Sequence, residues 1–204
     1  MSRDKSESHR RIIKAAKKEF LEYGYNDASL RRIAAEANIQ VGGLYNHFSS
    51  KEEMFESLVD PAITEFFELY RTIEKEYFEE TDTADENHSW ESRSEVVRMM
   101  ECIYDHYDEI RLLVMRSEGT KYEDFKHKIA TLEEEITLRY LDVLKDKGCK
   151  VNDFDRTEFH LLTTAYVEAF FQPLIHGLDR DKAIHYARTH EGFFQPAWKV
   201  WLGI

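Results

Sequence analysis

Residues 29–48 read SLRRIAAEANIQVGGLYNHF, and the SSKE that follows completes the stretch that decides the fold. Its first apolar series recurs at intervals of three and four residues, which indicates one face of a short helix. That series is Leu30, Ile33, Ala34 and Ala37, and a second with similar spacing is Val41, Leu44, Tyr45 and Phe48. Only residues 38–40 separate the two, so we expect a helix-turn-helix, whose second helix can enter a DNA major groove.

The residues that carry this pattern also resemble a known family. LRRIAAEANIQVGGLYNHFSSKEEMF, residues 30–55, resembles the DNA-binding core of the TetR (tetracycline repressor) family of bacterial transcriptional regulators. The resemblance extends from Arg11 to about Leu58. It implies an all-α fold with a three-helix DNA-binding head at residues 1–50. The body, residues 51–204, would bind an effector and form a homodimer.

The resemblance further implies which residues of the head contact an operator. Four would mainly hold phosphates through hydroxyl, imidazole or ammonium groups: Ser29, Tyr45, His47 and Lys51. Four would lie nearer base edges, where an amide can pair with adenine and a valine can meet a thymine methyl: Gln40, Val41, Gly43 and Asn46. The ring of Tyr45 is expected on the apolar face, with only its hydroxyl emerging.

The sequence departs from the family pattern in the turn and the second helix of the motif. Asn38 stands where glycine is usual, and asparagine is the next best residue for a left-handed turn. Gln40 replaces a Ser or Thr cap, and Val41 replaces a residue that is often polar or basic. Gly42 and Gly43 each cost roughly 1 kcal/mol of helix stability relative to alanine. Their missing side chains would let the backbone approach another surface, and the alternative is that they only mark a loop.

The distribution of charge supports a DNA-binding head on an acidic body. The chain has 204 residues and a formal net charge of −12, which argues against a general nucleic-acid binder. Residues 1–52, however, carry ten Lys/Arg and seven Asp/Glu, a net charge of +3, and the remainder carries −15. Such a split fits a protein that contacts phosphate at one end only. The alternative is a solvated acidic surface with a slightly basic tail.

Apolar periodicity predicts helices along the rest of the chain. We expect a first helix from about His9 to Tyr23, ended by Gly24, and a capping box formed by Ser50 and Glu53. The helix after that box should reach about Phe78, with a kink at Pro61. An acidic loop is expected at residues 79–89. Further helices are expected at about residues 90–107, 108–117, 122–147, 153–176 and 179–202.

The last two of these predicted helices carry more apolar residues than a helix with one solvent-exposed face would carry. A helix that is apolar on most sides must be buried on most sides, which suggests a second subunit. We therefore expect a homodimer with two helices from each protomer, an arrangement the family resemblance also implies. An ordinary monomer core is the alternative. The interface residues expected are Tyr166, Phe170, Leu174, Ala187, Phe194, Trp198 and Trp201.

Aromatic, sulfur-containing and polar residues in the body are candidates for a pocket that binds a small-molecule effector. An aromatic wall with a buried carboxylate would suit a lipophilic cation. Residues at helical spacing are, however, usually core. The candidates are Met99, Cys102, Ile103, His106, Tyr107, Tyr122, Phe125, Tyr140, Tyr166, Glu168 and Phe171.

The sequence offers little for catalysis, cofactors, metals or membranes. HExxH, GxSxG and phosphate-cradling glycine motifs are absent, so we expect no enzyme and no cofactor. Cys102 and His106 could share a helix face, but spacing supplies no third ligand, so no metal is expected. Two isolated cysteines and a charged N-terminus indicate a cytoplasmic protein without a membrane partner. The rival hypothesis is a helical effector- or metal-sensing protein whose head contacts protein rather than DNA.

Overall fold

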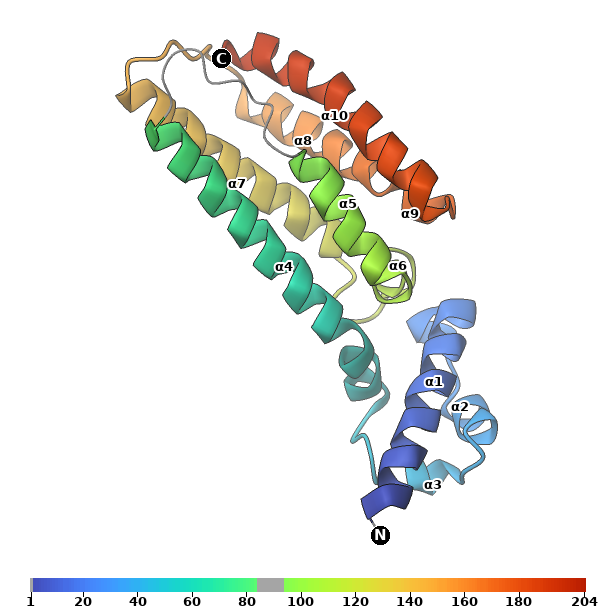
Figure 1. Cartoon of the computed structure of the whole chain (residues 1–204). Helices are drawn as coiled ribbons and strands as arrows, with labels where there is room; N and C mark the ends of the chain where they lie inside the picture. Colours follow the sequence, from blue (N-terminus) through green and yellow to red (C-terminus); the bar gives the residue numbers. More distant parts are fainter. Residues whose placement is uncertain (1, 84–93) are drawn as a thin grey trace. The chain divides into compact units, whose positions relative to one another are not determined.

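The computed structural model describes residues 2–83 and 94–204, and all regular secondary structure in these residues is helical (Figure 1). The predicted all-α fold is therefore confirmed. The chain divides into two compact units. The head unit comprises Met1–Glu65 and His106–Glu123, and the body unit comprises Phe66–Asp105 and Asp124–Ile204. The domain boundary at residue 50 stays a prediction, and the structure adds residues 106–123 to the unit that contains the N-terminal helices.

Five helices form the head unit, wholly or in part. They are α1 (Ser2–Asp27), α2 (Leu30–Glu36), α3 (Val41–Leu44), the start of α4 (Lys51–Thr83), and α6 (Tyr107–Met115). α1 packs against α2 and α6, and α2 packs against α3. The rings of Phe20 and Phe55 meet edge to face at 5.2 Å in the core of this unit. Such a pair contributes about 0.5–1.5 kcal/mol beyond the burial of its apolar area.

Gly24 and Asn38 take backbone conformations with a positive φ, which glycine adopts most easily. Gly24 interrupts α1 with a φ of 76°, where the sequence predicts the helix to end. Asn38 takes a φ of 55° in the turn between α2 and α3, which confirms the predicted left-handed asparagine. Asparagine tolerates this region because its short polar side chain can hydrogen-bond locally.

The second helix of the motif is shorter than the sequence predicts. α3 contains one turn, because Gln40 makes no side-chain cap bond and two of its four residues are glycines with low helix propensity. Leu44 and Phe48 are buried as expected. The prediction that the Tyr45 ring lies on the apolar face is wrong, since the residue lies just beyond α3 and is 56% exposed.

The body unit contains the remainder of α4 and five further helices. These are α5 (Glu95–Asp105), α7 (Phe125–Asp146), α8 (Arg156–Phe170), α9 (Gln172–Ile175) and α10 (Arg180–Leu202). α7 packs against α8, and α10 packs against α5, α8 and α9 (Figure 1). The helix predicted for residues 153–176 is divided at Phe171, and Pro173 stands at the start of α9, where proline is tolerated.

The predicted start of α4 is correct, but its predicted end is not. Ser50 Oγ accepts a hydrogen bond from the Glu53 amide at 3.0 Å, and the helix continues through Pro61 to Thr83. Residues 79–83, predicted to be loop, are therefore helical. The rest of that loop and the predicted helix start at Trp90 lie outside the described residues. Across the residues that the structure describes, every helix is too short or too polar to cross a membrane.

Candidate nucleic-acid interface

A buried carboxylate organises the entry into the helix-turn-helix. Glu19 of α1 is only 7% exposed, and its Oε1 accepts hydrogen bonds from the Ser29 amide and from Arg32 Nε, both at 2.8 Å. Arg32 Nη2 adds an ion pair at 2.5 Å. Ser29 caps α2 as predicted, with Oγ accepting from the Arg32 amide at 3.5 Å. Because that contact uses the oxygen as acceptor, the Ser29 hydroxyl hydrogen remains available for a phosphate oxygen.

Several cations of the head are already engaged within the protein. Arg32 lies over the Tyr23 ring at 4.1 Å in addition to its contacts with Glu19. Lys18 pairs with Glu36 at 2.9 Å, and Lys17 pairs with Glu109. The net positive charge of the head therefore overstates the number of side chains that are free to meet phosphate.

Lys51 is the most fully engaged of these cations. Its ammonium donates to the carbonyl oxygens of Tyr25 at 2.7 Å, Asn26 at 3.2 Å and Ala28 at 3.4 Å. It also lies 4.5 Å from the centre of the Tyr25 ring, and burial lowers the pKa of the Lys51 ammonium. The sequence predicts a phosphate contact for Lys51, whereas in the structure this ammonium joins the start of α4 to the turn between α1 and α2.

The residues predicted to lie near bases surround the short helix α3. Gln40 and Asn46 are exposed, and Val41 and Gly43 are half-buried. A Cβ atom added at Gly42 would meet no atom within 4 Å, so close packing inside the head does not require this glycine. His47 is half-buried, and its ring centre lies 5.6 Å from that of His9 on α1. The structure thus gathers the polar candidates at one end of the head, while their contacts with DNA stay predictions.

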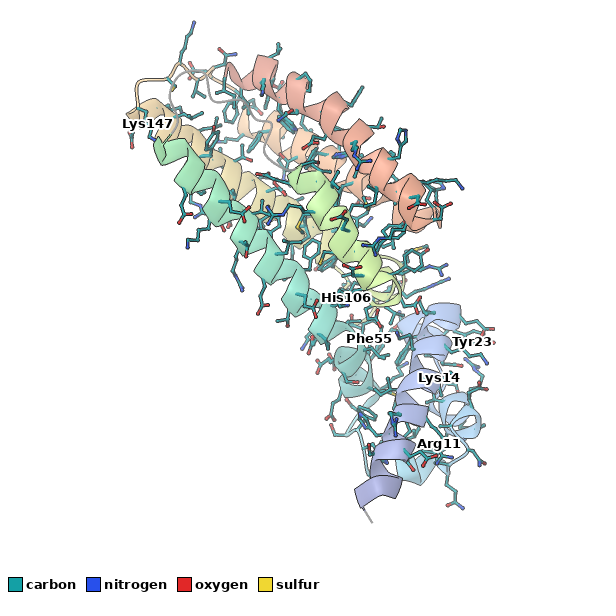
Figure 2. All side chains as sticks on the ribbon, viewed as in Figure 1. Arg11, Lys14, Tyr23, Phe55, His106 and Lys147 are labelled. Atoms are coloured by element: carbon teal, nitrogen blue, oxygen red, sulfur yellow. The ribbon has the colours of Figure 1, made fainter. Side chains whose placement is uncertain are left out.

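The structure also reveals cations that the sequence analysis did not select. Arg31 is exposed at the start of α2, and no protein partner is found for its guanidinium among the described residues. Arg11 and Lys14 project from α1 (Figure 2), and Arg11 donates a hydrogen bond to the Ser8 hydroxyl at 3.3 Å. The sequence alone does not distinguish Arg31 from Arg32, because only the structure shows that Glu19 binds Arg32.

The predicted effector-pocket residues are divided between the two units, and the pocket itself stays a prediction. His106, Tyr107 and Tyr122 belong to the head unit, where His106 Nε2 contacts Glu65 at 2.7 Å and the Tyr122 hydroxyl donates to Asp60 at 2.5 Å. The others belong to the body unit: Met99, Cys102, Ile103, Phe125, Tyr140, Tyr166, Glu168 and Phe171. Glu168 is not a buried carboxylate, since Lys126 pairs with it at 2.6 Å near the surface.

Three of the seven predicted interface residues are buried within the body unit, and four keep part of their surface accessible. Phe170, Leu174 and Ala187 are buried within the body unit. Tyr166, Phe194, Trp198 and Trp201 are half-buried. The large apolar side chains that α8 and α10 expose are instead Leu161, Leu162, Phe193 and Val200, and the sequence analysis missed these as interface candidates.

Metal ligation finds no support in the arrangement of ligand side chains. Within residues 2–83 and 94–204, no three His, Cys, Asp or Glu side chains come together as a metal site would require. Cys102 lies on α5, whereas His106 follows the end of that helix and has a non-helical backbone. The expected shared helix face is therefore absent.

The arrangement of α2, the turn at Asn38 and α3 defines a helix-turn-helix protein. Residues 12–58 match the sequence model described as "Bacterial regulatory proteins, tetR family". An HTH-type transcriptional regulator of Staphylococcus aureus (strain bovine RF122 / ET3-1) is 32% identical over 77 residues, which cover 38% of this chain and 42% of that regulator. A regulator from S. aureus strain USA300 gives the same identity and coverage. The match thus spans less than half the length of these relatives.

Solved structures extend the similarity in fold to most of the chain. A TerR/AcrR-family transcriptional regulator from Aquifex aeolicus VF5 has a TM-score of 0.55 and 16% identity, covering 92% of this chain and 99% of that one. The TetR family regulator PfmR from Thermus thermophilus also has a TM-score of 0.55, with 20% identity over 89% and 95% of the two chains. Residues 12–58 thus match the tetR family of bacterial regulatory proteins, and most of the chain shares the fold of these solved transcriptional regulators.

Proposed function

We propose that this protein is a transcriptional repressor that binds a palindromic operator as a homodimer and is released by a small-molecule effector. Support for DNA binding comes from the surface around α3. It combines the exposed amides of Gln40 and Asn46 with the Ser29 hydroxyl and the guanidinium of Arg31. Amides can read base edges, and cations and hydroxyls can hold phosphates.

Lys51 has a positioning role in this proposal. Its ammonium holds the carbonyl oxygens of the turn that precedes Ser29, so it fixes the start of α2 relative to α4. The phosphate charge would instead be met by Arg31 and by α1 cations such as Arg11 and Lys14. This division separates the residues that bind DNA from those that hold the binding surface in shape.

The dimer in this proposal uses an apolar stripe on two helices. Leu161, Leu162 and Ala165 are exposed on α8, and Phe193, Ala197 and Val200 are exposed on α10. Phe193 is 72% and Val200 81% exposed, and exposed apolar patches of this kind are typical of protein–protein contacts. A two-fold dimer would place two heads on half-sites about 34–36 Å apart.

A gel-shift experiment with the DNA upstream of the protein's own gene tests the DNA-binding proposal. We expect the protein to shift this DNA, and an excess of a scrambled competitor duplex of the same length should not abolish the shifted band. The band should weaken as the salt concentration rises. A protein that binds neither duplex, or both equally, would contradict the proposal. The rival hypothesis, in which the head contacts protein, predicts no sequence-specific shift.

Light scattering after size-exclusion chromatography tests the dimer separately. Phe193→Glu should convert the protein from a dimer to a monomer, because it places a charge in an apolar contact. Arg188→Gln, at an exposed position on the side of α10 away from Phe193 and Ala197, is the control and should remain dimeric. A monomeric wild-type protein, or a Phe193→Glu variant that remains dimeric, would contradict the proposal that this stripe forms the dimer interface.

A further inference from the structure

The turn that leads into the helix-turn-helix contacts a loop that follows much later in the chain. The Tyr25 amide donates a hydrogen bond to the carbonyl oxygen of Arg116 at 2.9 Å. Gly119 lies so close to the Asn26 side chain that a Cβ atom added at this glycine would be 2.2 Å from Asn26 Oδ1. Residues 116–123, which we call the α6–α7 loop, belong to the same head unit as α2 and α3, although the sequence analysis assigned them to the body.

Gly119 meets two demands at this contact. Its φ of 82° lies in the left-handed region, which glycine adopts without steric cost. In addition, an added Cβ atom would lie 3.0 Å from Asn26 Cγ and 3.1 Å from Asn26 Nδ2, so an alanine here requires either the loop or the Asn26 amide group to move. Gly148 shares the φ of 82°, but a Cβ atom added there would meet no atom within 4 Å. The backbone demand is thus common to both glycines, and the packing demand is specific to Gly119.

Buried hydroxyl groups fix the shape of the α6–α7 loop. Thr120 Oγ1 donates to the Ser117 carbonyl oxygen at 2.7 Å and accepts from the Tyr122 amide at 3.1 Å. Ser117 Oγ donates to the Leu113 carbonyl oxygen of α6 at 2.7 Å. Thr120 is 6% and Ser117 4% exposed, so these bonds form in surroundings of low polarity, which strengthens them. The loop therefore presents its backbone to the turn in one defined conformation.

The α6–α7 loop is also anchored to α4. The Tyr122 hydroxyl donates to Asp60 at 2.5 Å, and the centre of the Tyr122 ring lies 6.1 Å from that of Phe55. Lys121 pairs with Glu56 at 2.6 Å. These α4 residues lie in the part of the helix that belongs to the head unit. The loop therefore connects the turn between α1 and α2 to the first part of α4.

The turn that is held in this way determines where α2 begins. It ends at Ala28, and Ser29 follows directly as the cap of α2. Lys51 of α4 binds three carbonyl oxygens of the turn, and the α6–α7 loop binds its amide at Tyr25. Because both contacts fix the turn, they also fix the Ser29 hydroxyl and the first turn of α2, which carries Arg31. Binding groups lose affinity when their supporting residues let them move by about 0.5 Å or more.

We propose that the α6–α7 loop is a positioning element of the DNA-binding surface, and that the contact of Gly119 with Asn26 fixes the start of α2. The loop acts through the turn and not by its own contact with DNA. Its effect on operator affinity rests on the proposed function, because that effect requires the head to bind DNA. Its effect on the turn does not, and it can be measured on the free protein.

Hydrogen exchange in the full chain without DNA tests the effect on the turn. The variants are Gly119→Ala and the control Gly148→Ala, which introduces the same backbone strain where a Cβ atom has space. We expect the Tyr25 and Ser29 amides to exchange about tenfold faster in Gly119→Ala, because the loop no longer holds the turn. The control should leave both amides at the wild-type rate. Unchanged exchange in Gly119→Ala would overturn the proposal.

A second substitution separates the lost contact from general destabilisation. Asn26→Ala removes the amide group that the new methyl group of Gly119→Ala would meet. In the double variant, exchange at the Tyr25 and Ser29 amides should therefore return to within about twofold of the rate in Asn26→Ala alone. A double variant that exchanges as fast as Gly119→Ala would contradict the role of the Asn26 contact.

Tyr122→Phe tests the same loop without a change in backbone strain. It removes the hydroxyl that donates to Asp60 and keeps the ring. Tyr104→Phe is the matched control, because it removes a hydroxyl that donates to the Leu178 carbonyl oxygen at 2.9 Å in the body unit. We expect Tyr122→Phe to accelerate exchange at the Tyr25 amide about threefold and Tyr104→Phe to leave it unchanged. Equal rates in the two variants would contradict an anchoring role for Tyr122.

Operator affinity connects the position of the turn to DNA binding. In a gel-shift titration with the upstream DNA, at a temperature where every variant is folded, Gly119→Ala should bind about fivefold more weakly than wild type. Gly148→Ala should bind within about twofold of wild type. Normal operator binding by Gly119→Ala would overturn the positioning role and leave the proposed function intact. A wild-type protein that binds no upstream DNA would contradict the proposed function and the positioning role together.

Discussion

Glu19 in the head unit and Glu133 in the body unit are both acidic side chains placed among apolar helix faces, and the protein treats them in opposite ways. Glu19 receives the Ser29 amide and two nitrogens of Arg32. Glu133 has no cationic partner among the described side chains, and burial raises the pKa of its carboxyl. The first carboxylate holds α1 to the start of α2 through its Oε1 atom. The second keeps hydrogen-bonding capacity that the described residues do not use.

The two acids differ in the form, charged or protonated, that the folded protein favours. A carboxylate that is paired and hydrogen-bonded supports the fold in its charged form, whereas one without a cation favours the protonated form in the folded state. Both residues look alike in the sequence, as single acids within amphipathic helices. Only their partners distinguish them.

Removal of Glu19 should have the largest effect on the free energy of unfolding. Glu19→Ala leaves the Ser29 amide and the Arg32 guanidinium without their acceptor, so we expect a loss of about 2–3 kcal/mol. Urea denaturation of wild type and variant measures this difference. A loss below about 0.5 kcal/mol would show that the Glu19 contacts are dispensable, and the comparison with Glu133 would fail.

Replacement of Glu133 should change how stability depends on pH. Because the pKa of Glu133 is raised in the folded state, its favourable contribution is present below the unfolded pKa and is lost as pH rises through the folded pKa. Glu133→Gln removes this loss, so its stability relative to wild type should increase as pH rises above the ordinary glutamate range. Denaturation at a series of pH values checks the sign, and a constant difference would contradict a raised pKa at Glu133.

The surface carboxylate Glu168 provides the smallest expected effect. Its pair with Lys126 is partly exposed, so Glu168→Gln should change the free energy of unfolding by no more than about 0.5 kcal/mol. Urea denaturation of wild type and Glu168→Gln measures this difference, and a loss above about 1.5 kcal/mol would contradict a weak, partly exposed pair.

The fold of the head could be predicted almost completely from sequence. Local rules sufficed, because the Ser29 cap, the left-handed Asn38 and the break at Gly24 each follow from the preferences of single residues. The extent of α3 was overestimated, since apolar spacing continues to Phe48 while two glycines limit the helix to one turn.

The candidate sites were harder to predict, because they depend on contacts between distant residues. Periodicity could not show that Lys51 reaches the carbonyl oxygens of residues 25, 26 and 28, or that Tyr122 contacts Asp60 in the head unit. It also favoured Glu168 over Glu133, although Lys126 binds the former. On α8 and α10, periodicity predicted an interface at aromatic residues that are half-buried in the structure, and it did not show that Phe193, Leu161 and Val200 are more exposed.

The central claim is that the head binds DNA through cations that have no protein partner, while engaged cations hold the surface in shape. The salt dependence of operator affinity in Arg31→Ala and Lys51→Met tests it most directly. Arg31→Ala should reduce the slope of log K against log salt by about 1, whereas Lys51→Met should destabilise the protein and leave the slope unchanged. A reduced slope in Lys51→Met with an unchanged slope in Arg31→Ala would contradict the account.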